Sequence, residues 1–119
     1  MARRLKDLDM KDFKALPPLT HDHTYMGWEM ILLHLYNGRN MHWYMAEFDP
    51  MGQRFFGYFE GGGEGINSGL YSLDFFRSYD KKGGKWEVMV DDDWKQIRAQ
   101  EIPILKNYIK MMICPQENF

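Results

Sequence analysis

At 119 residues the chain is long enough for one domain with one hydrophobic core, since chains divide only at greater length. Hydrophobic residues make up 45% and aromatic residues 16%, a composition that excludes intrinsic disorder. Fifteen basic against seventeen acidic residues leave a formal charge of −2, which excludes a nucleic-acid binder driven by net positive charge. We therefore predict a single domain over residues 1–119.

The N-terminal segment predicts a short helix over residues 5–16, ended by Pro17-Pro18. Four apolar residues recur there at roughly helical spacing, namely Leu5, Leu8, Phe13 and Leu16. No apolar stretch of signal-peptide length follows the basic start of the chain, and the longest apolar run, Met30–Leu33, is far too short for a membrane span. We therefore expect a soluble, cytoplasmic protein with no membrane partner.

Residues 25–99 predict an antiparallel sheet. Asn37-Gly38 is typical of a two-residue hairpin turn, and a second turn follows at Asp49–Gly52. Gly57 predicts a bulge or a close approach to a neighbouring backbone. The strands expected on either side of these turns are Met26–Tyr36, Met41–Phe48 and Arg54–Glu60.

Two further helices complete the pattern. Ser72 is expected to cap a short helix that reaches Tyr79, and Pro103 opens a final helix over residues 103–112. The sum is an α+β fold, an antiparallel β-meander sheet flanked by an N-terminal and a C-terminal helix.

Three sequence blocks carry a family resemblance. Residues 43–50 read W-Y-M-A-E-F-D-P, residues 55–61 read F-F-G-Y-F-E-G, and residues 69–73 read G-L-Y-S-L. In this order they resemble the domain of unknown function 2958 family, over residues 25–100. That family usually has an acid shortly before the third block, where this chain has Ile66-Asn67-Ser68. The resemblance implies an accessory protein of a phage, plasmid or integrated element, and supplies no catalytic residue.

The histidines are the residues to test for a metal site. His21 and His23 have ligand-compatible spacing without a third ligand, so weak metal binding by this pair stays open. A two-residue turn at Asn37-Gly38 would place His34 opposite Met41 and direct His34 and His42 to opposite faces. No metal site is therefore expected.

The carboxylates of Glu47 and Asp49 lie two residues apart on a strand, so alternation puts them on one face. Such a pair can act in acid–base chemistry or bind a cation. Alternatively, Asp49 closes the turn that follows it and Glu47 pairs with a cation such as Arg54. Asp91–Asp93 lacks the pattern of a calcium loop and is expected to be a solvated bend.

No motif for nucleophilic catalysis or cofactor binding is present. The glycine run Gly61–Gly65 is not followed by Gly-Lys-Ser or Gly-Lys-Thr, and no serine lies in a G-x-S-x-G context. The one cysteine, Cys114, precedes Pro115 near the chain end, where a nucleophile would not be positioned. We expect a non-enzymatic protein without a cofactor.

The aromatic content favours a protein-binding module. Four Trp, seven Tyr and eight Phe exceed what a small domain buries fully, and Trp and Tyr are enriched at interface hot spots. An aromatic face with an acidic rim would dock on a basic surface of a host protein; homodimerisation is a further expectation. The residues expected to contact the partner are Trp43, Glu47, Tyr58, Glu60, Gly62 and Glu64. Trp43, Glu47 and Tyr58 would equally suit a core signature of the fold.

The mobile-element setting that the resemblance implies makes a host defence complex the expected partner, so that the protein would be an anti-CRISPR or anti-restriction factor. The alternative is nucleic-acid binding through the basic N-terminal helix, although Asp7, Asp9 and Asp12 interrupt its positive charge. Two clusters of basic residues are present, Arg3, Arg4, Lys6, Lys11 and Lys14 in the first and Lys81, Lys82 and Lys85 in the second.

Overall fold

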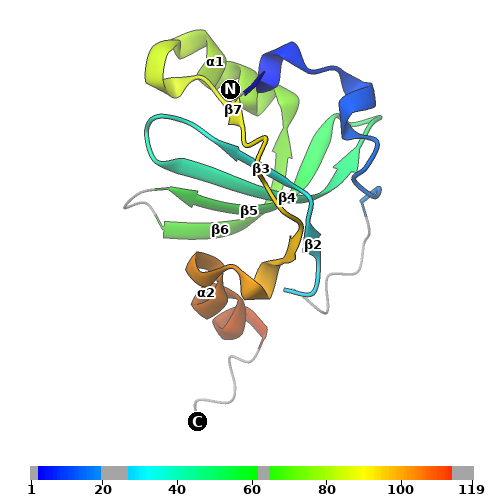
Figure 1. The fold of residues 1–119 in the computed structure, drawn as a ribbon, viewed down its shortest axis with the longest axis vertical. Coiled ribbons are helices and arrows are strands. Elements are labelled where there is room, and N and C mark those ends of the chain that lie inside the picture. The colour runs from blue at the N-terminus through cyan, green and yellow to red at the C-terminus, as the bar shows by residue number, and fades with distance from the viewer. Residues whose placement is uncertain (1–2, 20–26, 62–64, 114–119) are drawn as a thin grey trace.

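The computed structural model describes residues 3–19, 27–61 and 65–113 (Figure 1). Within them, six strands form an antiparallel sheet in the order β1-β7-β3-β4-β5-β6, and β2 pairs separately with β8. The strands are β1 (Arg3–Arg4), β2 (Met30–Ile31), β3 (Leu33–Tyr36), β4 (Met41–Asp49), β5 (Arg54–Gly61), β6 (Gly65–Ser72), β7 (Met89–Val90) and β8 (Ile97–Arg98). Strands β3 to β6 form the predicted meander, and the predicted α+β class is confirmed.

Two α-helices lie at opposite ends of the molecule with the sheet between them, and the connection from β7 to β8 crosses in front of β3 and β4 (Figure 1). The helices are α1 (Leu73–Lys82) and α2 (Pro103–Ile113), and the 3₁₀ turns are η1 (Leu5–Asp7), η2 (Met10–Phe13), η3 (Gly84–Trp86) and η4 (Ala99–Glu101). Neither α-helix in this part of the chain is long and apolar enough to cross a membrane.

The predicted caps and the C-terminal helix are confirmed. Ser72 begins α1, since its Oγ accepts the Phe75 backbone N–H at 3.0 Å. Gly83 ends that helix with φ +70°, a conformation in which glycine meets no Cβ penalty. Pro103 opens α2.

Each face of the sheet carries its own hydrophobic core. On the α1 side the largest buried residues include Trp43, Phe55 and Phe76, packed edge to face or at an angle. On the α2 side Tyr58 packs with Leu105 and other residues of η4 and α2. The central strands are therefore covered on both faces, as their near-continuous apolar sequence predicts.

The N-terminal segment is not the predicted helix over residues 5–16. Leu5 and Phe13 are buried in the α1-side core, so the apolar pattern is correct, but the backbone forms two separate 3₁₀ turns. The reason is a capping box: Asp9 accepts the Lys11 N–H at 3.2 Å and Asp12 accepts the Asp9 N–H at 2.8 Å. The side chains of Asp9 and Asp12 thus stabilise the start of a second turn, at a point where the predicted helix would have continued.

A β-bulge at Ala46 changes which residues of β4 share a face. Met45 lies opposite Gly57, whereas Glu47 lies opposite Phe56, so one extra residue stands on β4. Phe48 consequently joins Met45 in the α1-side core. Simple alternation would put Glu47 on the same face as Met45. Because of the bulge, Glu47 projects to the opposite face.

Gly57 shows the predicted close packing. A Cβ there would collide with the Tyr44 carbonyl oxygen and lie 2.8 Å from the Met45 Cα. Only glycine fits beside this part of the bulge.

The β3–β4 hairpin has a longer turn than Asn37-Gly38 predicts. Tyr36 pairs with His42, and the Asn37 N–H donates to the Met41 carbonyl at 3.1 Å, which leaves Gly38–Asn40 as the loop. Asn40 has φ +60°, the left-handed residue that ends a three-residue hairpin loop. The turn therefore contains one more residue than the predicted one, and its last position needs a residue that tolerates positive φ, such as Asn or Gly.

This turn changes the register and corrects the prediction for the histidines. His34 lies opposite Tyr44 rather than Met41. The register between β3 and β4 is shifted from the expected register by an odd number of residues. Such a shift reverses which side chains of the two strands share a face of the sheet. His34 and His42, predicted to face opposite sides, instead meet on the α2 side of the sheet.

Candidate functional site

His34 lies at the centre of a chain of three polar side chains. Its Nδ1 is 2.8 Å from Asp91 Oδ2, and its Nε2 is 2.9 Å from His42 Nδ1. Because a carboxylate only accepts, His34 Nδ1–H donates to Asp91. In the contact between His34 Nε2 and His42 Nδ1, one nitrogen donates and the other accepts, and the tautomers decide which.

Four aromatic rings surround His34. Tyr44 stacks on it with ring centroids 4.9 Å apart, His42 at 5.2 Å and Tyr36 at 5.7 Å, and Trp94 packs at an angle at 5.0 Å. The stack is built by cross-strand pairing, since Tyr36 faces His42 and His34 faces Tyr44 on the adjacent strand.

Trp94 joins the connection between β7 and β8 to this stack. Its Nε1–H donates to the Ile31 carbonyl at 2.9 Å, and its ring packs against Tyr44 at 5.8 Å. The indole is therefore held at both ends, by a hydrogen bond and by ring contact.

Burial favours the neutral forms of His42 and Tyr44 in the stack. Burial lowers the pKa of His42 below its ordinary 6.5, and the neighbouring His34 adds to this effect, while Glu60 opposes it. Burial, with a smaller effect of the Glu60 charge, raises the pKa of Tyr44 to about 12. Carboxylates lie around these rings, at Glu60, Asp91 and Asp93.

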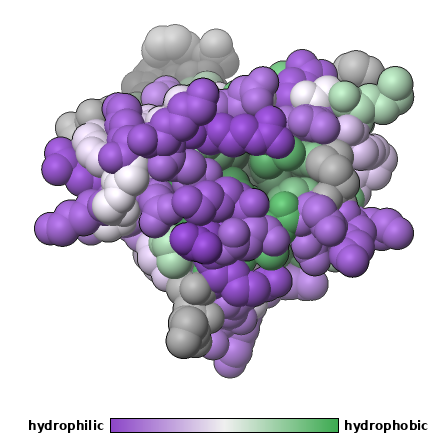
Figure 2. Space-filling model, turned by 90° about the horizontal axis from the view of Figure 1, so that it is seen from above, coloured by the Kyte–Doolittle hydropathy of each residue, from purple (hydrophilic) through white to green (hydrophobic). Residues whose placement is uncertain are grey.

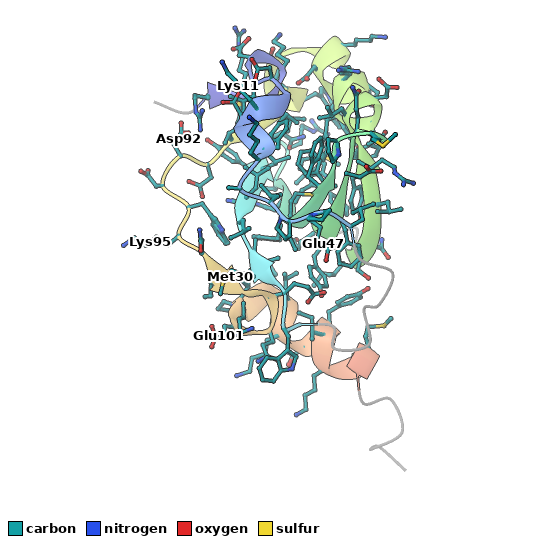
Figure 3. All side chains as sticks on the ribbon, turned by 90° about the vertical axis from the view of Figure 1, so that its right-hand side faces the viewer. Lys11, Met30, Glu47, Asp92, Lys95 and Glu101 are labelled. Carbon is teal, nitrogen blue, oxygen red and sulfur yellow. The ribbon has the colours of Figure 1, made fainter. Side chains whose placement is uncertain are left out.

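A groove of about 430 Å³ opens beside the stack, between the sheet and the β7–β8 connection. Figure 3 shows Asp92 and Lys95 on this connection, which runs along the outside of the sheet. The groove is lined by His34, Tyr44, Asp91, Asp93, Trp94, Lys95, Ile97, Ile102 and Pro103. We define the aromatic–acidic surface as Tyr36, His34, His42, Trp94, Glu60, Asp91 and Asp93, with the buried ring of Tyr44 beneath it.

Of the predicted contact residues that the structure describes, Glu60 lies on this surface. It is half-buried and pairs directly with His42 across β4 and β5. Gly62 and Glu64 lie outside the described residues, as do His21, His23 and Cys114.

Trp43, Glu47 and Tyr58 lie inside the protein. Trp43 and Tyr58 have no exposed area, and Glu47 is 6% exposed. Trp43 Nε1 is buried without a hydrogen-bond partner among the described residues. In this conformation none of the three presents a surface to a partner, which supports the alternative that they are part of the core.

Tyr58 has a structural contact of its own. Its hydroxyl donates to Glu29, with both carboxylate oxygens 3.1 Å away, and the Gly27 N–H donates to the same carboxylate at 2.6 Å. Burial, together with the Glu29 charge, raises the Tyr58 pKa. The hydroxyl therefore links β5 to the segment that precedes β2.

Asp49 closes the β4–β5 turn, as the alternative for this residue predicts. Its Oδ1 accepts the Met51 N–H at 3.0 Å, and its Oδ2 is 3.3 Å from Arg54 Nη2. The Gly52 backbone N–H, assisted by Met51 and Arg54, lowers the Asp49 pKa. Arg54 thus pairs with Asp49 rather than with Glu47.

The basic N-terminal segment is largely neutralised. Arg3 pairs with Asp92 at 2.7 Å, and Lys6 pairs with Glu87 at 2.6 Å. Arg4 and Lys11 likewise lie near acids of their own turns, Asp7 and Asp9. The helix expected to bind nucleic acid is absent, and four of the five cations of the N-terminal cluster lie near carboxylates.

No group of three or more His, Cys, Asp or Glu residues within the described ranges could hold a metal ion. The two facing nitrogens of His34 and His42 bond to each other, so neither is directed at a common ligand position.

Of the aromatic–acidic surface, sequence reasoning named Glu60 as a contact residue and missed the other members. A signal for the histidines and for Tyr36 was present, because His34-Leu35-Tyr36 and His42-Trp43-Tyr44 repeat a His-x-Tyr pattern on adjacent strands. Side chains two apart share a face, so the pattern predicts two matched aromatic pairs once the strands are in register. Asp91 and Trp94 reach the site only through the long β7–β8 connection.

A second hollow opens at the end of the molecule that carries α1 and the N-terminal turns. Seen from that end, the surface is mostly hydrophilic around an apolar floor (Figure 2). A cavity of about 270 Å³ lies between these elements, lined by Leu5, Lys6, Leu8, Asp9, Phe13, Gln53, Leu73, Phe76, Arg77 and Asp80. Its floor is the α1-side core itself.

No family model, curated protein or solved structure matches this chain.

Proposed function

We propose that this protein is a non-enzymatic binding module that docks through its aromatic–acidic surface onto a basic surface of a host protein. One observation carries the proposal. A stack of rings centred on His34 is fixed by Asp91 and opens on a groove with carboxylates at its edge.

The chemistry of this surface selects a cationic partner. The three carboxylates of Glu60, Asp91 and Asp93 outnumber the one Lys or Arg among the residues that line the groove, Lys95. The faces of Tyr and Trp rings attract guanidinium and ammonium groups, by about 0.5–1 kcal/mol each where they are exposed. An Arg- or Lys-rich surface therefore meets both attractive charge and aromatic faces here.

The stack is held in place before a partner arrives. His34 is bonded at both ring nitrogens, and Trp94 is fixed through its indole N–H. Side chains that are already ordered lose little rotamer freedom on binding, which favours affinity.

Binding is favoured over catalysis because the Asp91–His34–His42 chain has no nucleophile at its end. Among the residues that the structure describes, no Ser, Thr or Cys side chain hydrogen-bonds to His42. A His–Asp pair activates a nucleophile only when that group lies within hydrogen-bond reach.

The biological setting is proposed from the resemblance to the domain of unknown function 2958 family. A phage- or plasmid-encoded protein of this kind would act in the bacterial cytoplasm, and the host partner we propose is a defence complex, such as a CRISPR or restriction complex. The protein would then be a counter-defence factor.

The experiment is capture of partners from nuclease-treated bacterial lysate with the tagged protein, followed by affinity measurement on the captured protein. The test variant is Glu60→Lys, which reverses one charge of the surface. The matched control is Glu101→Lys, an exposed carboxylate on η4. We expect the test variant to bind about tenfold more weakly and the control to bind within about twofold of the original.

Three results would contradict the proposal. Equal binding by Glu60→Lys and Glu101→Lys would show that the surface is not the interface. Capture that depends on nucleic acid and changes with Glu60→Lys would show a different class of ligand at this surface. Light scattering that finds a dimer disrupted by Glu60→Lys, with no host protein captured, would show that the surface binds a second copy of this chain.

A further inference from the structure

The second basic cluster of the sequence is folded against the β3–β4 hairpin. The Gly38 N–H donates to the Lys85 carbonyl at 2.9 Å, and the Asn37 side-chain amide donates to the Trp86 carbonyl at 3.4 Å. The end of α1, η3 and the hairpin loop are thus joined at one edge of the molecule. Arg39, far from the lysines in sequence, becomes part of the same cluster.

Two aromatic rings organise this cluster. Tyr79 and Trp86 stack with centroids 5.8 Å apart and planes 14° from parallel. Lys82 Nζ lies 4.3 Å from the Trp86 ring centroid, and Arg39 Cζ lies 4.6 Å from it. One indole therefore holds two cations near each other.

The cations of this cluster lack acidic partners. Within the described residues none of Arg39, Lys81, Lys82 and Lys85 makes an ion pair, and all four are exposed. The nearby carboxylate of Asp80 accepts the Val88 N–H with its Oδ1 at 2.9 Å and makes no ion pair with these four cations. The cluster therefore differs from the N-terminal segment, whose cations are paired.

We infer that Arg39, Lys81, Lys82 and Lys85, with Trp86 and Tyr79, form a binding site for single-stranded nucleic acid. Unpaired cations that lie close together bind phosphates with release of counterions. Aromatic side chains in a positively charged site are the usual stacking platform for unpaired bases, and on Trp86 a base would take the place of the cation side chains that lie over the ring. Lysines at the C-terminal end of α1 also interact favourably with the helix dipole. This effect does not explain the presence of Arg39 or Lys85, which lie outside the helix.

This site is separate from the aromatic–acidic surface. Trp86 and Tyr79 pack against the α1-side core, whereas Tyr44 belongs to the α2-side core. The sheet thus lies between a basic and an acidic binding surface, and the two can be tested independently.

The experiment is fluorescence anisotropy of a labelled oligothymidylate titrated with the full chain. The test variant is Lys82→Glu/Lys85→Glu. The control is Lys106→Glu/Lys110→Glu on α2, which reverses the same number of exposed charges. We expect the test variant to bind at least about tenfold more weakly and the control to change much less. The slope of log affinity against log salt should fall by about 1.4, or about 0.7 for each phosphate that the variant no longer neutralises.

Several results would overturn the inference. The first is that the oligonucleotide does not bind at low salt. The second is that both double variants weaken binding equally, and the third is that the test variant binds more tightly. Inorganic polyphosphate that binds as tightly as the oligonucleotide, with the same dependence on the variants, would assign the site to bare polyphosphate. A protein partner that fails to bind Lys82→Glu/Lys85→Glu, without an effect on oligonucleotide binding, would assign it to an acidic protein.

Discussion

Asp91 binds His34 twice, once with its backbone N–H, 3.0 Å from the His34 carbonyl oxygen, and once with its carboxylate, 2.8 Å from His34 Nδ1. The two residues are 57 positions apart in the chain. This double contact fixes the start of the β7–β8 connection on β3, and the connection in turn carries Trp94 to the ring stack. A single carboxylate therefore orients the central imidazole and holds one wall of the groove.

We predict that Asp91→Ala lowers the free energy of unfolding by about 1–3 kcal/mol, because it removes a hydrogen bond to a partly buried group. The adjacent Asp93→Ala should change it by less than about 0.5 kcal/mol, since Asp93 is exposed. Urea denaturation of both variants measures the difference. If the two variants lose equal stability, the carboxylate of Asp91 does not hold the connection.

A second prediction concerns pH. Folded His42 binds its proton less tightly than an unfolded histidine with pKa 6.5, so below that pH the unfolded state binds more protons. The contribution of His42 to stability is therefore complete above pH 6.5 and is lost as the pH falls from 6.5 through the folded pKa.

Urea denaturation at about pH 7.5 and about pH 5.5 tests this sign. His42→Asn keeps a side-chain N–H donor and removes the titration, so it should lose less stability between the two pH values than the original protein. The other titratable groups at the stack, His34, Glu60 and Asp91, are common to both proteins. An equal loss in both proteins would mean that His42 does not contribute to the pH dependence.

Much of the fold could be predicted from the sequence because local patterns determine it. The Ser72 cap, the Pro103 helix start and the close packing at Gly57 each depend on one residue and its immediate neighbours. The apolar spacing of the N-terminal segment likewise predicts which of its residues are buried, although it does not predict the backbone conformation of these residues. There Asp9 and Asp12 satisfy backbone N–H groups that a longer helix would have used.

The site depends on features that local patterns do not specify. One additional loop residue, completed by Asn40 at positive φ, decides whether the two histidines meet. The bulge at Ala46 decides on which face Glu47 lies. Asp91 and Trp94 reach the stack only because a long connection crosses the sheet, and the sequence alone does not show where that connection lies.

The hairpin register gives a third prediction. Asn40 has φ +60°, which a β-branched residue adopts only with strain, so Asn40→Val should destabilise the protein by about 1–2 kcal/mol. Asn40→Gly is the matched control and should cost at most a few tenths of a kcal/mol, since glycine adopts this conformation freely. Thermal unfolding compares the two variants. Similar melting temperatures would show that the left-handed residue is not required for the turn.

The last prediction separates a core role from an interface role for Tyr58. Tyr58→Phe removes the hydroxyl that donates to Glu29 and keeps the buried ring, so the free energy of unfolding should fall by about 1–2 kcal/mol. Tyr71→Phe is the control, because no hydrogen bond of its hydroxyl is present among the described residues, and it should have a smaller effect. Partner affinity, measured at a temperature where both variants are folded, should be unchanged. A Tyr58→Phe protein that is fully stable but binds its partner more weakly would instead place Tyr58 in the interface and require a conformation in which the α2-side core opens.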